Sequence, residues 1–230
     1  MDYIELVNKR KLYPVTYNGF INQSQIEKGI FDTGSYLEPW GQWHNAVPTD
    51  ILLVGQDWSG QDYYIKNEGK DIGTNFTCSN LIKLCTQAGF DIGTPQKPFS
   101  DLKLHFANVI PFIRKGEMAG NKNNIINDGI IKDCSIEFLK PLIDIVSPKI
   151  IITLGSCAYK GVRYAFDLPA DKSFTIAVDN APIAIEPDIK IFPMFHCGAM
   201  GVNRNRKLPK QSEDWSKLIP YVKNLTIESI

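Results

Sequence analysis

The sequence predicts an α/β fold: a three-layer α/β/α domain around a central, mainly parallel four-stranded sheet. Three observations predict it. Apolar runs of strand length recur along the chain, segments with helical spacing of apolar residues separate them, and glycine or proline stands at most of their ends. A run that is apolar at every position is typical of a strand covered on both faces. Strands that alternate with helices favour parallel crossovers.

Four segments are predicted to form the sheet, at residues 51–54, 104–109, 150–154 and 189–195. The third of them, with the sequence IIITL, is the clearest buried strand in the chain. The turn-rich residues 167–188 between the third and fourth segments are expected to hold a short hairpin or an edge strand.

Helices are expected between these strands. Residues 80–87 have apolar side chains at helical spacing and are followed by Gly89, a residue typical of a helix end. Residues 127–146 also read as helical, and Pro141 is expected to kink or divide that helix. Two further helices are expected, at 155–166 and from about residue 214 to 223.

The chain of 230 residues is long enough to bury a sizeable core without disulfides. Residues 1–47 mix aromatic and turn-forming residues, and we expect an irregular, partly helical lead-in packed on the α/β domain of residues 48–230. The five cysteines include no C-x-x-C pair, so reduced thiols are expected rather than a zinc or iron–sulfur site.

The charge balance bears on the class of partner. Lysine plus arginine equals aspartate plus glutamate, 25 against 25, which excludes a uniformly basic coat but not a local basic patch. No apolar run reaches the roughly 18 residues of a membrane span, and the first residues carry acids where a signal peptide carries positive charge. We expect a soluble, cytoplasmic protein with no membrane partner.

Phosphate-binding loops are excluded first. Gly55 and Gly60 have the spacing of a P-loop, but glutamine and aspartate follow where lysine and Ser/Thr are needed. The glycine pattern of a dinucleotide-binding turn is also missing, because Asp57 stands at its third position and an acid there would repel a pyrophosphate.

Three loops are expected to meet at the carboxyl edge of the sheet, where ligands bind in open α/β folds. Asp57 follows the first strand, and alone it reads equally well as a turn cap. Asn108 is embedded in an apolar strand, where its amide either ties backbone segments together or reads the edge of a nucleobase. His196 ends the last strand and is well placed to donate to a developing anion.

A basic loop follows His196, with Arg204, Arg206 and Lys207 and no acid before Glu213. Such a run is often only a solvated face, but beside a histidine in a cleft it indicates a clamp for backbone phosphates.

In their order and spacing these segments resemble the uracil-DNA glycosylase superfamily. GQD at 55–57 is similar to its first motif, and FANV at 106–109 is similar to its central strand with the base-reading asparagine. LGSCA at 154–158 is similar to a strand-to-helix join, and His196 stands where the second motif has its histidine. The resemblance covers about residues 48–222. The residues after Asp57 and His196 depart from the usual motifs, which affects substrate preference.

The resemblance implies hydrolysis of a base–deoxyribose bond in damaged or uracil-containing DNA, by a monomer without metal or cofactor. The base is flipped into a pocket. Asp57 would orient water and stabilise the sugar cation, and His196 would donate to the base. Two sets of contacts are implied: the base-binding residues are Gln56, Trp58, Phe76 and Asn108, and the DNA-backbone residues are Ser59, Met200, Asn203, Arg204, Arg206 and Lys207. Phe76 also reads as a plain core residue.

Two alternatives remain. A relative on the same fold could bind a nucleobase or nucleic acid without turnover. A different small hydrolase would need a nucleophile, for which Ser59 and Cys197 are the candidates. Cys197 is adjacent to His196, but neighbouring residues of an extended strand point to opposite faces, so that pair is not expected to form a dyad.

Overall fold

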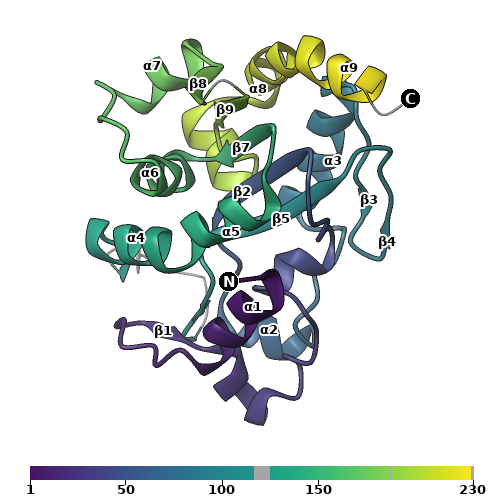
Figure 1. Ribbon diagram of the computed structural model, residues 1–230. Coiled ribbons are helices and arrows are strands. Elements are labelled where there is room, and N and C mark those ends of the chain that lie inside the picture. Colours follow the sequence, from purple (N-terminus) through teal and green to yellow (C-terminus); the bar gives the residue numbers. More distant parts are fainter. Residues whose placement is uncertain (117–124, 187, 229–230) are drawn as a thin grey trace.

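The computed structural model describes residues 1–116, 125–186 and 188–228 and is built around a five-stranded sheet (Figure 1). The strand order is β5-β2-β7-β9-β8. The bounds of these strands are β2 Ile51–Asp57, β5 Leu104–Ile110, β7 Ile150–Leu154, β8 Ile183–Glu186 and β9 Ile189–Met194. Strands β5, β2, β7 and β9 pair in parallel, whereas β8 pairs with β9 in the antiparallel sense.

The predicted α/β class is confirmed, and all four predicted strands are present. The expected four-stranded sheet is corrected to a mixed sheet of five strands. The additional strand, β8, lies within the turn-rich segment 167–188 and forms an edge. Because β8 and β9 follow each other closely in the chain, only a hairpin-like antiparallel pairing connects them.

Helices pack on both faces of the sheet, which explains why its strands are apolar at every position. Alternate side chains such as Leu52 and Val54 face α1 Tyr3–Leu12, α4 Asp128–Cys134, α5 Lys140–Val146 and α6 Ser156–Ala165. The intervening side chains, such as Leu53 and Phe106, face α3 Phe76–Ala88, α8 Leu208–Trp215 and α9 Ile219–Glu228. Burial of both faces supplies the main driving force for folding.

The helix boundaries follow from local sequence. The side chain of Asn75 caps α3 by accepting from the backbone of Cys78, and Gly89 ends the helix in a left-handed conformation with φ of 96°. The expected division of segment 127–146 is present. A π-helical turn, η4 Ser135–Leu139, separates α4 from α5, and Pro141 lies in the first turn of α5.

The remaining elements are short and lie around this core. They are β1 Phe20–Ile21, η1 Gln23–Gly29, η2 Pro39–Gln42, α2 Gln61–Lys66, β3 Gly93–Thr94, β4 Lys97–Pro98, β6 Ile113–Arg114, α7 Phe174–Asp179, η5 Gly201–Asn205 and η6 Ser216–Leu218. Strand β1 pairs with β6, which follows β5 directly. In the part of the chain that the structure describes, no helix is long and apolar enough to cross a membrane.

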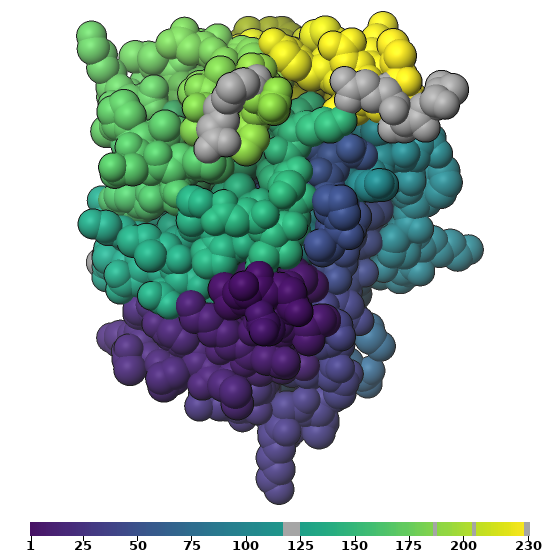
Figure 2. All heavy atoms as spheres, in the orientation of Figure 1, coloured from purple at the N-terminus to yellow at the C-terminus, as the bar shows by residue number. Residues whose placement is uncertain are grey.

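Residues 1–47 pack closely on the sheet and its helices. Leu6 and Val7 of α1 are buried with α5, while Trp40 and Trp43 pack against Phe106 from the other face. Figure 2 shows the purple N-terminal residues lying directly against the teal surface of the α4–α5 region. The segment therefore contributes to the core of the domain.

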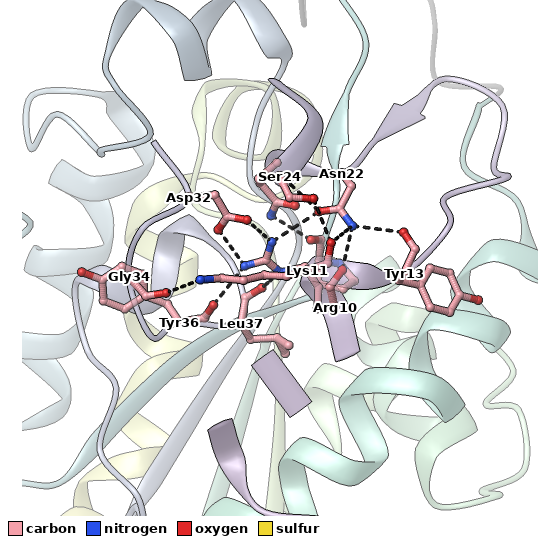
Figure 3. Close-up of polar contacts among 11 residues, drawn as sticks. Arg10, Lys11, Tyr13, Asn22, Ser24, Asp32, Gly34, Tyr36 and Leu37 are labelled. Atoms are coloured by element: carbon pink, nitrogen blue, oxygen red, sulfur yellow. Dashed lines mark hydrogen bonds and ion pairs between the residues drawn. The ribbon is translucent and has the colours of Figure 1, made fainter. Parts of the chain in front are cut away.

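The guanidinium of Arg10 is buried and holds this segment together (Figure 3). Its two terminal nitrogens donate to the carboxylate of Asp32 at 2.6 and 2.8 Å, and Nε donates to the carbonyl of Leu37 at 2.6 Å. Asn22 in turn donates to the carbonyls of Arg10 and Tyr13. Because every one of these groups is paired, the turn at 32–37 is tied firmly to α1.

Candidate functional site

The carboxyl ends of the parallel strands bring the two candidate catalytic residues to the same edge of the sheet. Asp57 ends β2, and His196 follows β9. Strand β7 lies between them and ends at Leu154, and an added Cβ at the next residue, Gly155, would be only 3.4 Å from the Cβ of His196. The negative charge of Asp57 reaches the imidazole of His196 and favours its charged form.

The carboxylate of Asp57 is held by an arginine that the sequence analysis did not single out. Arg114 of β6 contacts both carboxylate oxygens, with Nη2 at 2.7 Å from Oδ1 and Nε bonded to Oδ2. The side-chain amide of Gln56 donates to Oδ1 at 2.7 Å. The side chain of Asp57 is only 2% exposed, so this ion pair shields it from water.

His196 is exposed, and no group among the described residues is bonded to its Nε2. The backbone N–H of Gly198 donates to its Nδ1 at 3.0 Å, so Nδ1 is the acceptor of the ring. Desolvation by the surrounding protein lowers the pKa of His196 even though part of the residue is open to solvent, and the negative charge of Asp57 opposes this shift. The imidazole is therefore neutral at neutral pH and carries its proton on Nε2.

Asn108 lies in the interior of β5, where its amide is paired with a buried acid. Nδ2 donates to Oε2 of Glu38 at 3.1 Å. The amide leans over Gly55, because a Cβ at that position would be 2.2 Å from Oδ1. Glu38 is 3% exposed, and burial raises its pKa to about 8. A carboxyl group in such surroundings resists ionisation.

Trp58 is paired with a second acid. Its indole Nε1 donates to Asp71 at 3.0 Å, and its ring packs against Tyr63 and Tyr64. Burial raises the pKa of Asp71 to about 6, against the effect of the indole hydrogen bond. The charge of Asp71 also raises the pKa of Glu38.

Phe76 is 71% exposed at the first position of α3, so its reading as a core residue is wrong. The start of α3 is bonded to the loop that carries His196. Asn80 donates to the carbonyl of Cys197 at 2.7 Å, and the carbonyl of Thr77 accepts from the Cys197 thiol. The exposed ring of Phe76 therefore lies at the end of α3 that contacts the loop of His196.

Arg206 does not offer a free cation. Its guanidinium donates to both oxygens of Asp214 at 2.6 Å, lies over the ring of Phe195 and is 13% exposed. The phosphate contact expected at Arg206 would have to compete with this ion pair. Ser59 is buried, and its backbone carbonyl accepts a hydrogen bond from the backbone of Arg114. Little of its surface is therefore accessible for a contact with DNA.

Other residues of the basic loop remain accessible. Met200 is 60% exposed, and Asn203 and Lys207 are exposed. The side chain of Arg204 lies outside the described residues.

A cavity of about 290 Å³ opens beside Gln56 and Arg114, and it is also lined by Ser156, Cys157 and Lys160. It lies next to the Asp57 ion pair, at the start of α6. A larger cavity of about 460 Å³ lies at the amino end of β5 and touches none of the candidate residues. Within residues 1–116, 125–186 and 188–228, no cluster of three or more His, Cys, Asp or Glu side chains could hold a metal ion.

The thiol of Cys197 is not a usable nucleophile. It is fully buried, and burial raises the pKa of the thiol to about 12. The sulfur is directed to the carbonyl of Thr77 and not to the imidazole of its neighbour His196. The geometry thus speaks against a cysteine hydrolase.

Sequence reasoning missed Glu38, Asp71 and Arg114. Glu38 stands in the N-terminal segment and looks like an ordinary surface acid, and Asp71 lies in a turn-rich stretch. Arg114 carries the one available signal, since it follows directly on an apolar segment that ends in Phe112-Ile113.

No family model matches this chain, and no curated protein matches it significantly. The interpretation of the site therefore depends on the chemistry of its own residues.

Proposed function

We propose that the protein is a monofunctional DNA glycosylase of the uracil-DNA glycosylase type, which hydrolyses the N-glycosidic bond of uracil or a related damaged base. The observation that carries the proposal is the state of His196. Its Nδ1 accepts from Gly198, so a neutral ring offers Nε2–H at the strand edge that also holds Asp57. A donor and a carboxylate at one edge of the sheet match the two charges that develop in this reaction.

The reaction breaks the bond between C1′ of deoxyribose and a ring nitrogen of the base. The electron pair leaves with the base, while water adds its oxygen to C1′ and its proton passes to solvent or to the base. His196 donates from Nε2 to a carbonyl oxygen of the base as negative charge grows there. By analogy with an oxyanion-hole donor, this contact is worth about 10²–10³ in rate.

Asp57 supplies the negative charge beside the sugar cation and orients the water. In the structure the carboxylate oxygens of Asp57 accept hydrogen bonds from Arg114 and Gln56. Catalysis therefore requires at least one of these contacts to open when the nucleotide enters. The cavity beside Arg114 gives the guanidinium a direction in which to move.

The base would be held by residues around the same edge. Asn108 reads its amide face, the indole of Trp58 and the amide of Gln56 line the pocket, and Phe76 stacks on the ring. Stacking on an exposed aromatic contributes about 1–3 kcal/mol per base. Asn108 is 4% exposed, so entry of a base also requires neighbouring side chains to shift.

The proposed function also covers the fold family, the oligomeric state, the cellular location and the contacts with DNA. The four parallel strands would correspond to the core of a uracil-DNA glycosylase-like domain, acting as a cytoplasmic monomer on damaged or uracil-containing DNA. Met200 would wedge into the duplex, and Asn203, Lys207 and Arg204 would approach the backbone. Arg206 is not placed in this set, because its guanidinium is paired with Asp214.

The test is a panel of oligonucleotides that each carry one modified base, followed by detection of abasic sites. Wild-type protein should release at least one of the modified bases and leave an abasic site. D57N should bind the same oligonucleotide but lower single-turnover cleavage strongly, and H196A should lower mainly the rate. The matched control is D144N, because Asp144 is exposed on α5. Cleavage by D57N within a few-fold of wild type would contradict the assignment of Asp57.

A second candidate function is a non-catalytic relative that binds a nucleobase or nucleic acid. The ion pair between Asp57 and Arg114 favours it, because a neutralised carboxylate stabilises a sugar cation poorly. Binding of a modified oligonucleotide with no abasic product under single-turnover conditions would support this alternative over the glycosylase.

A further inference from the structure

Glu38 is bonded to a candidate base-reading side chain although 70 positions separate the two in the chain. It precedes η2 and is 3% exposed. One carboxyl oxygen, Oε2, accepts from the backbone of Trp40 at 3.0 Å and from Nδ2 of Asn108 at 3.1 Å. The other oxygen, Oε1, is buried and has no hydrogen-bond partner among the residues that the structure describes.

This arrangement decides which way the amide of Asn108 faces. Oε2 accepts two N–H groups, so it can pair with the amide nitrogen but not with the amide oxygen. A flipped amide would set Oδ1 against Oε2, with lone pairs opposed and a buried N–H left elsewhere. Nδ2 is therefore directed at Glu38, and Oδ1 lies over Gly55, where β2 leads into Gln56 and Asp57.

We propose that Glu38 is a positioning residue, which fixes the amide of Asn108 so that the carbonyl oxygen Oδ1 is the group presented to a flipped-out base. The inference rests on the proposed glycosylase function and deepens it. An acceptor at this point selects a base with a ring N–H beside a carbonyl, as in uracil. It disfavours a base with an unprotonated ring nitrogen, as in cytosine, because two acceptors would then face each other.

The electrostatics of Glu38 suit the same role. Burial raises its pKa to about 8, and the charge of Asp71 raises it further, whereas the hydrogen bonds from Trp40 and Asn108 and the charge of Arg10 lower it. At neutral pH the acid is therefore mostly protonated. Its proton belongs on Oε1, since Oε2 already accepts two hydrogen bonds. A neutral acid behind Asn108 adds no negative charge near a base that leaves as an anion.

Two substitutions separate this role from a merely structural one. In E38Q the side-chain carbonyl can still accept from Trp40 and Asn108, whereas E38L removes every acceptor at nearly the same volume. E68L is the matched control, because Glu68 is an exposed glutamate. Thermal unfolding of each variant shows whether it is folded before any comparison is made.

The first measurement does not depend on activity. The side-chain NH₂ signals of Asn108 are followed by ¹⁵N NMR and assigned by their loss in N108D. We expect one slowly exchanging, hydrogen-bonded proton in wild type and E38Q, and its loss in E38L. Unchanged Asn108 signals in E38L would overturn the proposal even if the protein cleaves no base at all.

The second measurement compares single-turnover cleavage of matched oligonucleotides with one uracil or one cytosine at the target position. We expect E38L to lower the preference for uracil over cytosine by about 10- to 100-fold, the range of one good base contact. E38Q and E68L should keep it within about threefold. A preference unchanged in folded E38L would overturn the proposal, whereas an inactive wild type would contradict the proposed function and leave the NMR measurement to decide on Glu38.

Discussion

Arg114 contacts both carboxylate oxygens of Asp57, and the pair joins the end of β2 to the short strand β6. Their side chains are only 11% and 2% exposed. A bidentate pair with so little water around it orients the carboxylate of Asp57, even though 57 residues separate the two partners.

Loss of Arg114 should therefore destabilise the fold. R114A leaves a buried carboxylate without a partner, which typically costs about 3–5 kcal/mol of the free energy of unfolding. Urea unfolding of wild type, R114A and the double variant R114A/D57N measures this cost. The double variant should recover part of the loss, because it contains no unpaired charge. Equal free energies of unfolding for wild type and R114A would show that the ion pair does not stabilise the fold.

The pKa of His196 should respond to Asp57 in a defined direction. The negative charge of Asp57 favours the imidazolium and so raises the pKa, against the effect of burial. In D57N that stabilisation is gone, and the pKa of His196 should fall further below its ordinary value. An NMR titration of the His196 ring protons measures the shift, with D144N as the control. A rise in the pKa of His196 in D57N would contradict an electrostatic interaction between the two side chains.

Glu38 should make stability depend on pH. Its ordinary pKa is 4.5, and in the folded protein burial raises it to about 8. Between these values the unfolded chain has released a proton that the folded chain still holds, so the free energy of unfolding falls as pH rises. The loss through this window is on the order of a few kcal/mol. Denaturation of wild type and E38Q at pH 5 and pH 8 should show a smaller decline in E38Q.

Phe76 should matter for binding but not for stability. Its ring is 71% exposed, so F76A should change the free energy of unfolding by less than about 0.5 kcal/mol. Loss of base stacking should weaken binding to the substrate oligonucleotide by about 1–3 kcal/mol. F106A provides the contrast, because Phe106 is buried in the core and its truncation should cost about 3–5 kcal/mol of stability. Unaltered oligonucleotide affinity in F76A would remove the ring from the site.

The two basic residues Arg206 and Lys207 should behave differently despite their adjacency. R206A breaks the ion pair with Asp214 and should lower stability while leaving the salt dependence of DNA binding unchanged. K207A should leave stability intact and reduce the slope of log K against log salt concentration by about one. Fluorescence anisotropy at several salt concentrations measures both slopes. A flattened slope in R206A would mean that Arg206 exchanges Asp214 for phosphate.

The central sheet could be predicted because strands that are covered by helices on both faces are apolar at every position. The apolar runs at β2 and β7, and the glycine after α3, each act through neighbours in sequence. Strand β8 was expected only as one option within a turn-rich segment, since it is a short edge strand with a mixed pattern.

The chemistry around the site could be predicted only in part. Asp57 ends β2, Asn108 lies near the carboxyl end of β5 and His196 follows β9, so the parallel topology brings them toward one edge of the sheet. Their partners do not follow from local pattern. The contacts of Glu38 with Asn108 and of Arg114 with Asp57 join segments 70 and 57 positions apart, and Arg206 looked free because its partner Asp214 lies on the next helix.

The network around Arg10 has a consequence for how this chain can vary. The hydrogen bonds of Arg10 hold the turn at 32–37 against α1. The position of Glu38, which follows that turn, therefore depends on the N-terminal segment. A graft that exchanged only residues 1–37 for a foreign sequence would keep all three edge residues and still alter the setting of Asn108. Under the proposed function, the N-terminal segment and the nucleobase preference should therefore diversify together.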